Sequence, residues 1–324
     1  MKNTKLEYWS EDEKTKNLEY WMALNDYEIE EGKLDIRQLL DEGLDIKDFF
    51  ESDYINLKKE FGDKVDYIWR DLKKIGSKVN LEAYKENKID LLQNDVRIIK
   101  YTDRLYSKSL KNSERLSPLV LYQKGTLLEL QNCVAIIGAR DSSHYGRQKA
   151  RELSQYLAEK GYIIVAGLAL GIDTEAHCGA LDVNGTTVAV IPNIKEITPQ
   201  SNRRLAEDIM KHGALLSSGS PFSKLSKDKW VKRNKIISGI SRCLIAIESP
   251  ESRGTHHQVN FALKQGIKVF VLEPRKSDKL ACSSFKRFLE MGATPFTVES
   301  EILDYLKNPI KVPPKQVLND FVPY

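Results

Sequence analysis

No stretch of the sequence approaches the roughly 20 consecutive apolar residues that a membrane-spanning helix requires. Residues 1–13 carry too many charges for a secretory signal peptide. These two absences argue against a membrane protein and a secreted one, so we expect a cytoplasmic protein without a membrane partner. Hydrophobic residues make up 41% of the 324 residues, enough to form one large core or two unequal cores.

Cysteine is also scarce, and the four cysteines are far apart in the sequence: Cys133, Cys178, Cys243 and Cys282. Metal sites need ligands at short, regular spacing. Cys133 and Cys243 instead lie within apolar runs, where a thiol serves as a small core residue. The adjacent His256 and His257 point in different directions on a helix. The sequence therefore predicts no metal site and no cofactor.

Charge of either sign is not in large excess, since the net charge is +4, but it is unevenly distributed. Residues 1–60 contain nine Lys and Arg against seventeen Asp and Glu, whereas the rest of the chain contains 41 against 29. A polyanion should therefore bind to the later part of the chain. A basic excess of this size over so long a segment does not by itself identify a nucleic-acid-binding protein.

Glycine and proline are scarce in residues 1–93, where apolar residues recur at helical spacing. We interpret Trp9, Trp21 and Trp69 as the core of a small helical bundle. The sequence therefore predicts an all-helical N-terminal domain over residues 1–93.

Short apolar runs alternate with amphipathic helical patterns over residues 94–310. The predicted strands are Val96–Lys100, Leu119–Tyr122, Val134–Ile137, Ile163–Ala166, Thr187–Ile191, Ala214–Leu216, Cys243–Ile247 and Val269–Leu272. The predicted crossover helices are Tyr145–Lys160, Asp173–Val183, Asn202–His212 and Gln258–Gln265. This alternation predicts an α/β fold with a Rossmann-like, doubly wound, mostly parallel sheet. A short tail, residues 311–324, follows.

The first candidate site is the turn after the run that ends at Ile137, because ligands of such sheets bind beyond the carboxyl ends of the strands. It contains Gly138, Ala139 and Arg140. Glycine permits close approach of the backbone, and amides at the following helix start attract anions. An arginine can hold a phosphate with two parallel hydrogen bonds.

Two later turns offer similar chemistry. The turn after Ala166 contains Gly167 and Gly171 and leads to Asp173, which fits helix capping as well as ligand binding. A further turn offers Gly254 and Thr255, with backbone amides and a hydroxyl for a phosphate. These residues suit a phosphate-bearing ligand.

A basic segment with one aromatic residue lies just before an apolar turn that we predict over residues 236–239. Its candidate binding residues are Trp230, Lys232, Arg233, Asn234 and Lys235. A base stacked on an aromatic ring contributes about 1 to 3 kcal/mol, while cations follow the phosphate backbone and make affinity salt-dependent. The alternative interpretation is a solvated basic helix start with Trp230 tucked inward.

These motifs, in this order, resemble the DNA-processing protein A (DprA/Smf) family, within the wider SLOG superfamily. The resemblance rests on Val134–Arg140, Gly167–Asp173, Ala176-His177 with Gly179–Leu181, and Arg233–Gly239, and it extends from Tyr101 to about Pro274. It implies an extended Rossmann domain that forms a homodimer, binds single-stranded DNA and loads a RecA-type recombinase during natural transformation, without catalysis. It also implies phosphate-pocket roles for Gly138, Arg140, Gly171, Lys232, Arg233, Asn234, Gly254 and Thr255.

The chain departs from the usual family pattern at several positions. Trp230 replaces the usual Phe and keeps a stacking surface. Lys235 replaces the usual Arg, which keeps the charge but loses the planar guanidinium that can form two parallel hydrogen bonds. Ser218 and Leu170 replace a Glu and an Arg, which removes one charge of each sign. We expect no counterpart, after about Leu306, of the winged-helix domain that follows in many members.

The alternative function is a nucleotide-binding sensor or nucleotide hydrolase of the same superfamily, for example in antiphage defence. The related hydrolases carry a Gly-Gly-x-Gly-Thr-x-x-Glu turn, and Gln258 occupies the position of that glutamate. An amide cannot act as the acid or base, so we do not predict an enzyme. A dinucleotide oxidoreductase is also disfavoured, because Gly138 does not begin a Gly-x-Gly-x-x-Gly motif.

Overall fold

The structure is a computed structural model that describes residues 15–31, 36–66, 68–69, 79–112, 117–126, 128–249, 253–275 and 279–309. The chain divides into two compact units, Met1–Asn94 and Asp95–Tyr324. Among the described helices, none is both long and apolar enough to cross a membrane. Trp9 and the predicted tail, residues 311–324, lie outside the described residues.

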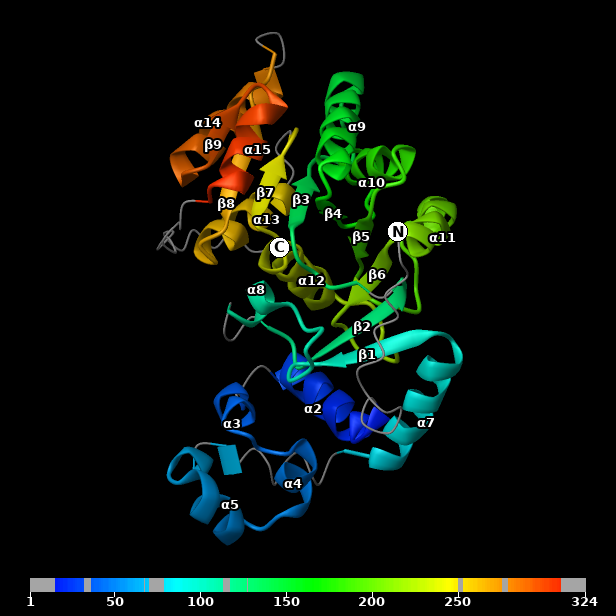
Figure 1. Ribbon diagram of the computed structural model, residues 1–324, viewed down its shortest axis with the longest axis vertical. Coiled ribbons are helices and arrows are strands. Elements are labelled where there is room, and N and C mark those ends of the chain that lie inside the picture. The colour runs from blue at the N-terminus through cyan, green and yellow to red at the C-terminus, as the bar shows by residue number, and fades with distance from the viewer. Residues whose placement is uncertain are drawn as a thin grey trace. The chain divides into compact units, whose positions relative to one another are not determined.

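Every element described in the first unit is a helix (Figure 1). The helices are α2 (Leu18–Glu31), α3 (Arg37–Asp41), α4 (Ile46–Glu51), α5 (Tyr54–Phe61) and α7 (Leu81–Gln93). The carboxylates of Asp45 and Asp53 cap α4 and α5 by accepting hydrogen bonds from backbone amides. Trp21 is buried, and the ring of Trp69 lies 5.3 Å from that of Tyr54.

The second unit is built on one nine-stranded sheet with the order β1-β2-β6-β5-β4-β3-β7-β8-β9. The strands are β1 (Val96–Lys100), β2 (Val120–Gly125), β3 (Cys133–Ile137), β4 (Ile163–Ala166), β5 (Thr187–Val190), β6 (Ala214–Ser217), β7 (Cys243–Ala246), β8 (Lys268–Leu272) and β9 (Thr294–Phe296). All neighbours from β6 to β9 pair in parallel, whereas β1 and β2 are antiparallel. The predicted doubly wound, mostly parallel α/β fold is confirmed.

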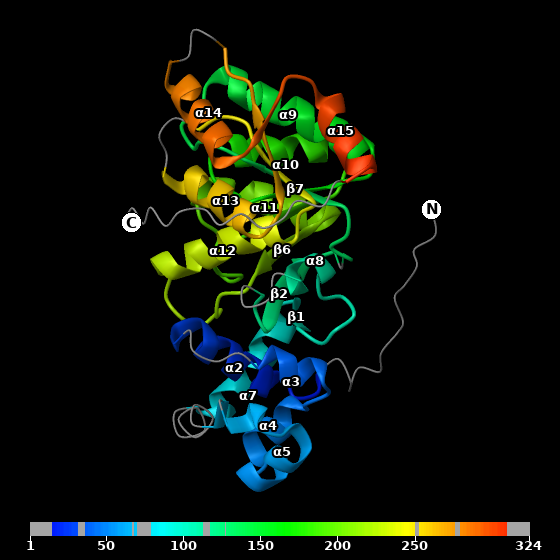
Figure 2. The ribbon, with the colours of Figure 1, turned by 90° about the vertical axis from the view of Figure 1, so that its left-hand side faces the viewer.

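Helices cover both faces of this sheet (Figures 1 and 2). They are α8 (Lys108–Lys111), α9 (His144–Glu159), α10 (Ile172–Asp182), the 3₁₀ helix Gln200–Asn202, α11 (Arg203–His212), α12 (Lys227–Gly239), α13 (Arg253–Lys264), α14 (Lys279–Met291) and α15 (Glu299–Lys307). Helix α10 packs between α9 and α11, and α13 packs between α12 and α14. The sequence pattern did not indicate β9, α14 or α15.

The predicted turn over residues 236–239 is wrong, because these residues form the last turn of α12. Ser226 caps the start of this helix, and its hydroxyl accepts a hydrogen bond from Lys229 N. Ile236 and Ile237 are both buried, so packing extends the helix through the Ser-Gly pair that suggested a turn.

Strands β3, β5 and β7 are buried along their whole length, as expected for a parallel sheet covered on both faces. Cys133 and Cys243 begin two of these strands, and burial raises the pKa of each thiol to about 12. Both thiols are therefore protonated and act as small core residues, as predicted.

His177 is a fully buried titratable group of the core. Its Nδ1 lies 2.7 Å from the hydroxyl of Thr187, which itself donates to the Ile164 carbonyl. Nδ1 is therefore the protonated nitrogen, and Nε2 has no hydrogen-bond partner among the residues that the structure describes. Burial lowers the pKa of this imidazole to about 3.

We expect acidification to destabilise the fold through His177. The unfolded chain binds a proton there below about pH 6.5, whereas the folded chain excludes it until about pH 3, so the free energy of unfolding falls by up to about 1.4 kcal/mol per pH unit in this window. His177→Asn keeps a donor near Thr187 but does not titrate. Urea unfolding between about pH 4 and 7 should give a shallower pH dependence for this variant. Identical slopes for the two proteins would contradict the prediction.

Candidate functional site

The candidate site lies where the winding direction of the sheet reverses. Strand β3 pairs with β4 on one side and with β7 on the other, and the chain proceeds outward in both directions from this point. The turns that follow β3, β4 and β7 therefore meet beyond the same carboxyl edge. This is where doubly wound folds bind their ligands.

Gly138 and Gly171 allow the turns after β3 and β4 to pack directly against each other. A side chain at Gly138 would come within 2.5 Å of Ile172, and one at Gly171 within 2.3 Å of the Ala139 carbonyl. Gly171 also has a φ of +77°, which favours glycine. The amide of Ala139 donates to Glu248 O at 2.7 Å, so it is already used inside the protein. These residues shape the turns.

A carboxylate already occupies the start of α9. Glu248 accepts hydrogen bonds from Ser143 N at 3.1 Å and from Ser143 Oγ at 2.9 Å, and that hydroxyl accepts from Gly146 N. A side chain at Gly146 would overlap the Glu248 carboxylate, so glycine makes the room. Two backbone amides at this helix start are therefore already used inside the protein, that of Ser143 by Glu248 and that of Gly146 by the Ser143 hydroxyl.

Arg140 is the exposed cation of the turn after β3. Its guanidinium carbon lies 6.0 Å from the centre of the Trp230 ring. Within the described part of the chain, this guanidinium makes no hydrogen bond. Its donors are therefore open toward solvent, beside a half-buried aromatic ring on α12.

Arg233 is buried and anchors α12 to the sheet. Its Nε donates to Val190 O at 2.8 Å, at the end of β5, and its Nη2 donates to Gly167 O, directly after β4. A side chain at Gly167 would overlap this guanidinium, which explains the glycine. Burial lowers the pKa of Arg233 to about 10, so it remains charged at neutral pH.

Asp173 balances the buried charge of Arg233. Its Oδ2 lies 3.7 Å from Arg233 Nη2 and accepts a hydrogen bond of 2.9 Å from Gly167 N. Burial raises the pKa of Asp173, and the nearby guanidinium opposes that shift. Asp173 therefore secures the second turn from inside the protein, where the sequence left capping and ligand binding equally open.

Asn234 is held in one orientation by two donors. Its Oδ1 accepts from Arg233 Nη1 at 2.7 Å and from Gln258 Nε2 at 3.2 Å. The amide assignment follows from these two bonds. Its Nδ2 faces away from both donors and makes no hydrogen bond to the described residues. Asn234 therefore offers two donors one helical turn after Trp230.

Lys232 and Lys235 do not join Trp230 on one surface. Helical geometry places Lys232 about 200° around α12 from Trp230. Lys235 lies with its ammonium 5.3 Å from the Phe261 ring, and burial lowers its pKa. The segment around Trp230 contains four cations, which are therefore distributed around the helix: Lys229, Lys232, Arg233 and Lys235.

The start of α13 contributes Gly254, which is exposed, and Thr255, which is buried. A side chain at Gly254 would meet no atom within 4 Å, so packing does not require glycine there. Two polar side chains anchor loops near the site: Asn202, which the sequence did not identify, and Lys229, which the sequence grouped with the cations around Trp230. Asn202 donates to the Leu168 carbonyl at 2.9 Å, and the Lys229 ammonium donates to Ser220 O at 2.7 Å. Asn202 has no sequence signal beyond its polar type.

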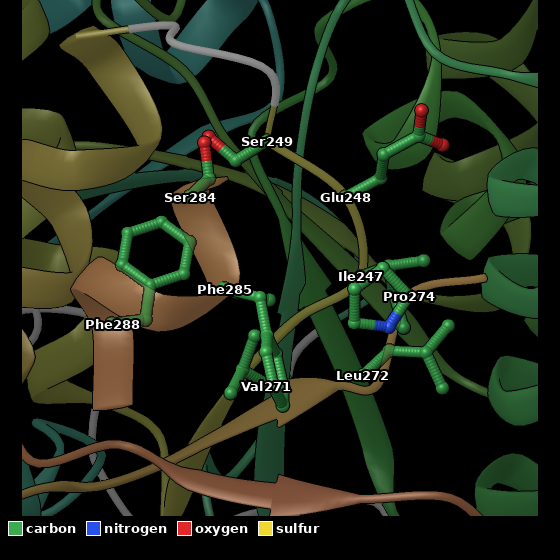
Figure 3. Close-up of a pocket in the computed structure, with 10 residues that line it drawn as sticks. Ile247, Glu248, Ser249, Val271, Leu272, Pro274, Ser284, Phe285 and Phe288 are labelled. Carbon is green, nitrogen blue, oxygen red and sulfur yellow. The ribbon is translucent and has the colours of Figure 1, made fainter. Parts of the chain in front are cut away.

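A small pocket lies at the carboxyl ends of β7 and β8 under α14 (Figure 3). Ser249 and Ser284 point toward each other at one end, and the Glu248 carboxylate turns away from them. The free volume is about 10 Å³, the lower limit for a single water molecule. None of the predicted site residues lines it. This pocket is a packing gap.

Residues 97–307 match the family described as DNA recombination-mediator protein A. The DNA processing protein DprA of Bacillus subtilis is 34% identical over 192 residues, which are 58% of this chain and 64% of that relative. The chain thus spans less than two thirds of the length of this relative.

Two solved structures resemble the fold. DNA processing protein A from Streptococcus pneumoniae has 28% identity and a TM-score of 0.62, covering 76% of this chain and 90% of that one. DNA processing protein A from Helicobacter pylori has 25% identity and a TM-score of 0.56, covering 65% and 95%. With the family match extending over well more than half of its residues, the chain belongs to the DNA recombination-mediator protein A family.

Proposed function

We propose that this protein binds single-stranded DNA as a recombination mediator and that Arg140, Trp230 and Asn234 contact the strand. The observation that supports this proposal most directly is the position of the exposed Arg140 guanidinium, whose central carbon lies 6.0 Å from the centre of the Trp230 ring. An aromatic ring accepts a stacked base, and open guanidinium donors accept a phosphate. Family membership supports the proposal, as does the Helicobacter pylori relative, which binds single-stranded DNA.

The other candidate residues have supporting roles in this proposal. Arg233 positions Trp230 and Asn234 from inside the protein. Lys232 and Lys235 attract the strand over a longer range. The remaining candidates shape or border the site: Gly138, Ala139, Gly167, Gly171, Gly254 and Thr255.

We also propose that the protein acts by binding, without turnover. Glu248 is the acid among the described residues of the turn after β7, and its carboxylate is engaged by Ser143. Gln258 offers an amide in place of a catalytic carboxylate. Family membership supports the further proposals that the protein forms a homodimer and that it loads a RecA-type recombinase during natural transformation.

The direct test is a titration of fluorescently labelled oligothymidine, read by anisotropy at two salt concentrations. Binding that weakens with salt and resists competition by duplex DNA or free nucleotides supports the proposal. Absence of binding to the single strand, with binding to a nucleotide instead, would overturn it in favour of a nucleotide sensor.

We expect Trp230→Ala to weaken oligothymidine binding about 5- to 150-fold, the loss of one stacked base. Arg140→Ala should reduce the slope of log affinity against log salt by about 0.7, because one phosphate contact disappears. Lys211→Ala is the matched control, because Lys211 is an exposed cation that pairs with Asp208 at the far end of α11. Wild-type affinity in both site variants would remove these residues from the proposed interface.

We expect Arg233→Met to lower the free energy of unfolding by about 3 to 5 kcal/mol, because Asp173 is left buried without its counter-charge. The double variant with Asp173→Asn should recover part of this loss, because both charges are then gone. Urea unfolding measures both effects, with Lys211→Ala again as control. A variant that is fully stable but cannot bind DNA would make Arg233 a direct contact.

A further inference from the structure

We propose a second stacking platform for the same strand, formed by Phe222 and Lys195 on the loops that follow β6 and β5. The proposal rests on the single-stranded DNA function proposed above and names where the strand continues beyond Trp230. The ligand is a run of unpaired nucleotides, with a base on the Phe222 ring and a phosphate near the Lys195 ammonium.

Phe222 combines exposure with a cation. It is 39% exposed, and Lys195 Nζ lies 4.6 Å from the centre of its ring. Leu170 and Val298 are the other large hydrophobic residues of comparable exposure among the described residues of the second unit, so Phe222 is the aromatic one. The pair repeats the arrangement of Arg140 over Trp230, an exposed cation beside an aromatic ring.

Two buried polar side chains hold this loop on either side of Phe222. The Asn193 side chain accepts a hydrogen bond from Lys195 N at 2.9 Å and donates to Pro221 O at 3.4 Å. The Lys229 ammonium donates to Ser220 O at 2.7 Å and to Ser223 O at 2.8 Å. Asn193 is 4% exposed and Lys229 is 5% exposed. The backbone on both sides of the exposed ring is therefore held in place, which lowers the entropy cost of stacking.

The platform lies along the same carboxyl edge as the first site. Strand β5 pairs with β4 and with β6, and β4 pairs with β3. With about 4.8 Å between neighbouring strands, the loops after β5 and β6 lie about 10 to 15 Å along the edge from the turn after β3. Lys229 directly precedes Trp230 on α12, so one helix links the two platforms. This distance suits a strand of several nucleotides.

The charges around Phe222 favour a polyanion. Lys195, Lys224 and Lys227 are exposed on the two loops and at the start of α12, and the neighbouring exposed acids are Glu196 and Asp228. Cations are thus in excess beside the ring. An aromatic ring with flanking lysines is the combination that single strands require, since bases stack and lysines follow the backbone.

The test compares oligothymidines of about 4, 8 and 16 nucleotides by anisotropy. We expect Phe222→Leu to weaken binding of the longer strands about 5- to 10-fold and to leave the shortest nearly unchanged, because a short strand occupies the Trp230 platform alone. Phe222→Trp should keep full affinity for long strands, because it keeps the ring. Val298→Ala, an equally exposed hydrophobic residue next to β9, is the matched control.

The outcomes separate the two proposals. Equal affinities of wild type and Phe222→Leu at every length, with Trp230→Ala weakened at every length, would overturn the second platform and leave the first site standing. No binding of any length by the wild-type protein would overturn the proposed function itself. A loss confined to the long strands in Phe222→Leu, restored in Phe222→Trp, supports the second platform.

Discussion

The buried guanidinium of Arg233 holds the site together. It donates to the backbone at the ends of β4 and β5 and to the side chain of Asn234. A charge in the interior needs a counter-charge and satisfied donors, and Asp173 and these carbonyls supply them. Gly167 follows from the same requirement, because any side chain there would occupy the place of the guanidinium. One helix, two strand ends and one turn therefore form a single unit.

This inward arginine determines what remains on the surface. Arg233 approaches the Trp230 ring at 5.7 Å, and Arg140 approaches it at 6.0 Å. The Arg233 guanidinium is buried and donates hydrogen bonds within the protein, and the Arg140 guanidinium is exposed. At the start of α9, the Glu248 carboxylate accepts hydrogen bonds from the backbone amide and the hydroxyl of Ser143, where a negative charge is favourable. At this edge of the sheet, the exposed guanidinium of Arg140 is therefore more accessible than the backbone amide of Ser143.

Much of the fold was predictable because its signal is local. Each predicted strand corresponds to a strand of the sheet within a few residues, since a strand buried on both faces needs a continuous apolar run. The site was less predictable. The sequence grouped Lys232, Arg233 and Lys235 as one basic cluster, but they lie on different sides of α12 with different partners. The order of residues along a helix says little about which face each one occupies until the partners are known.

The sequence by itself determined the alternation of strands and helices, the positions of the glycine turns, and the contrast between the acidic residues 1–60 and the basic remainder of the chain. These follow from periodicity and composition, which neighbouring residues fix. Only the tertiary structure decided that Arg233 points inward, that Glu248 caps α9 and that Arg140 lies over Trp230. The physical reason is that burial and charge pairing depend on residues more than 60 positions apart in the chain, such as Gly167 and Arg233.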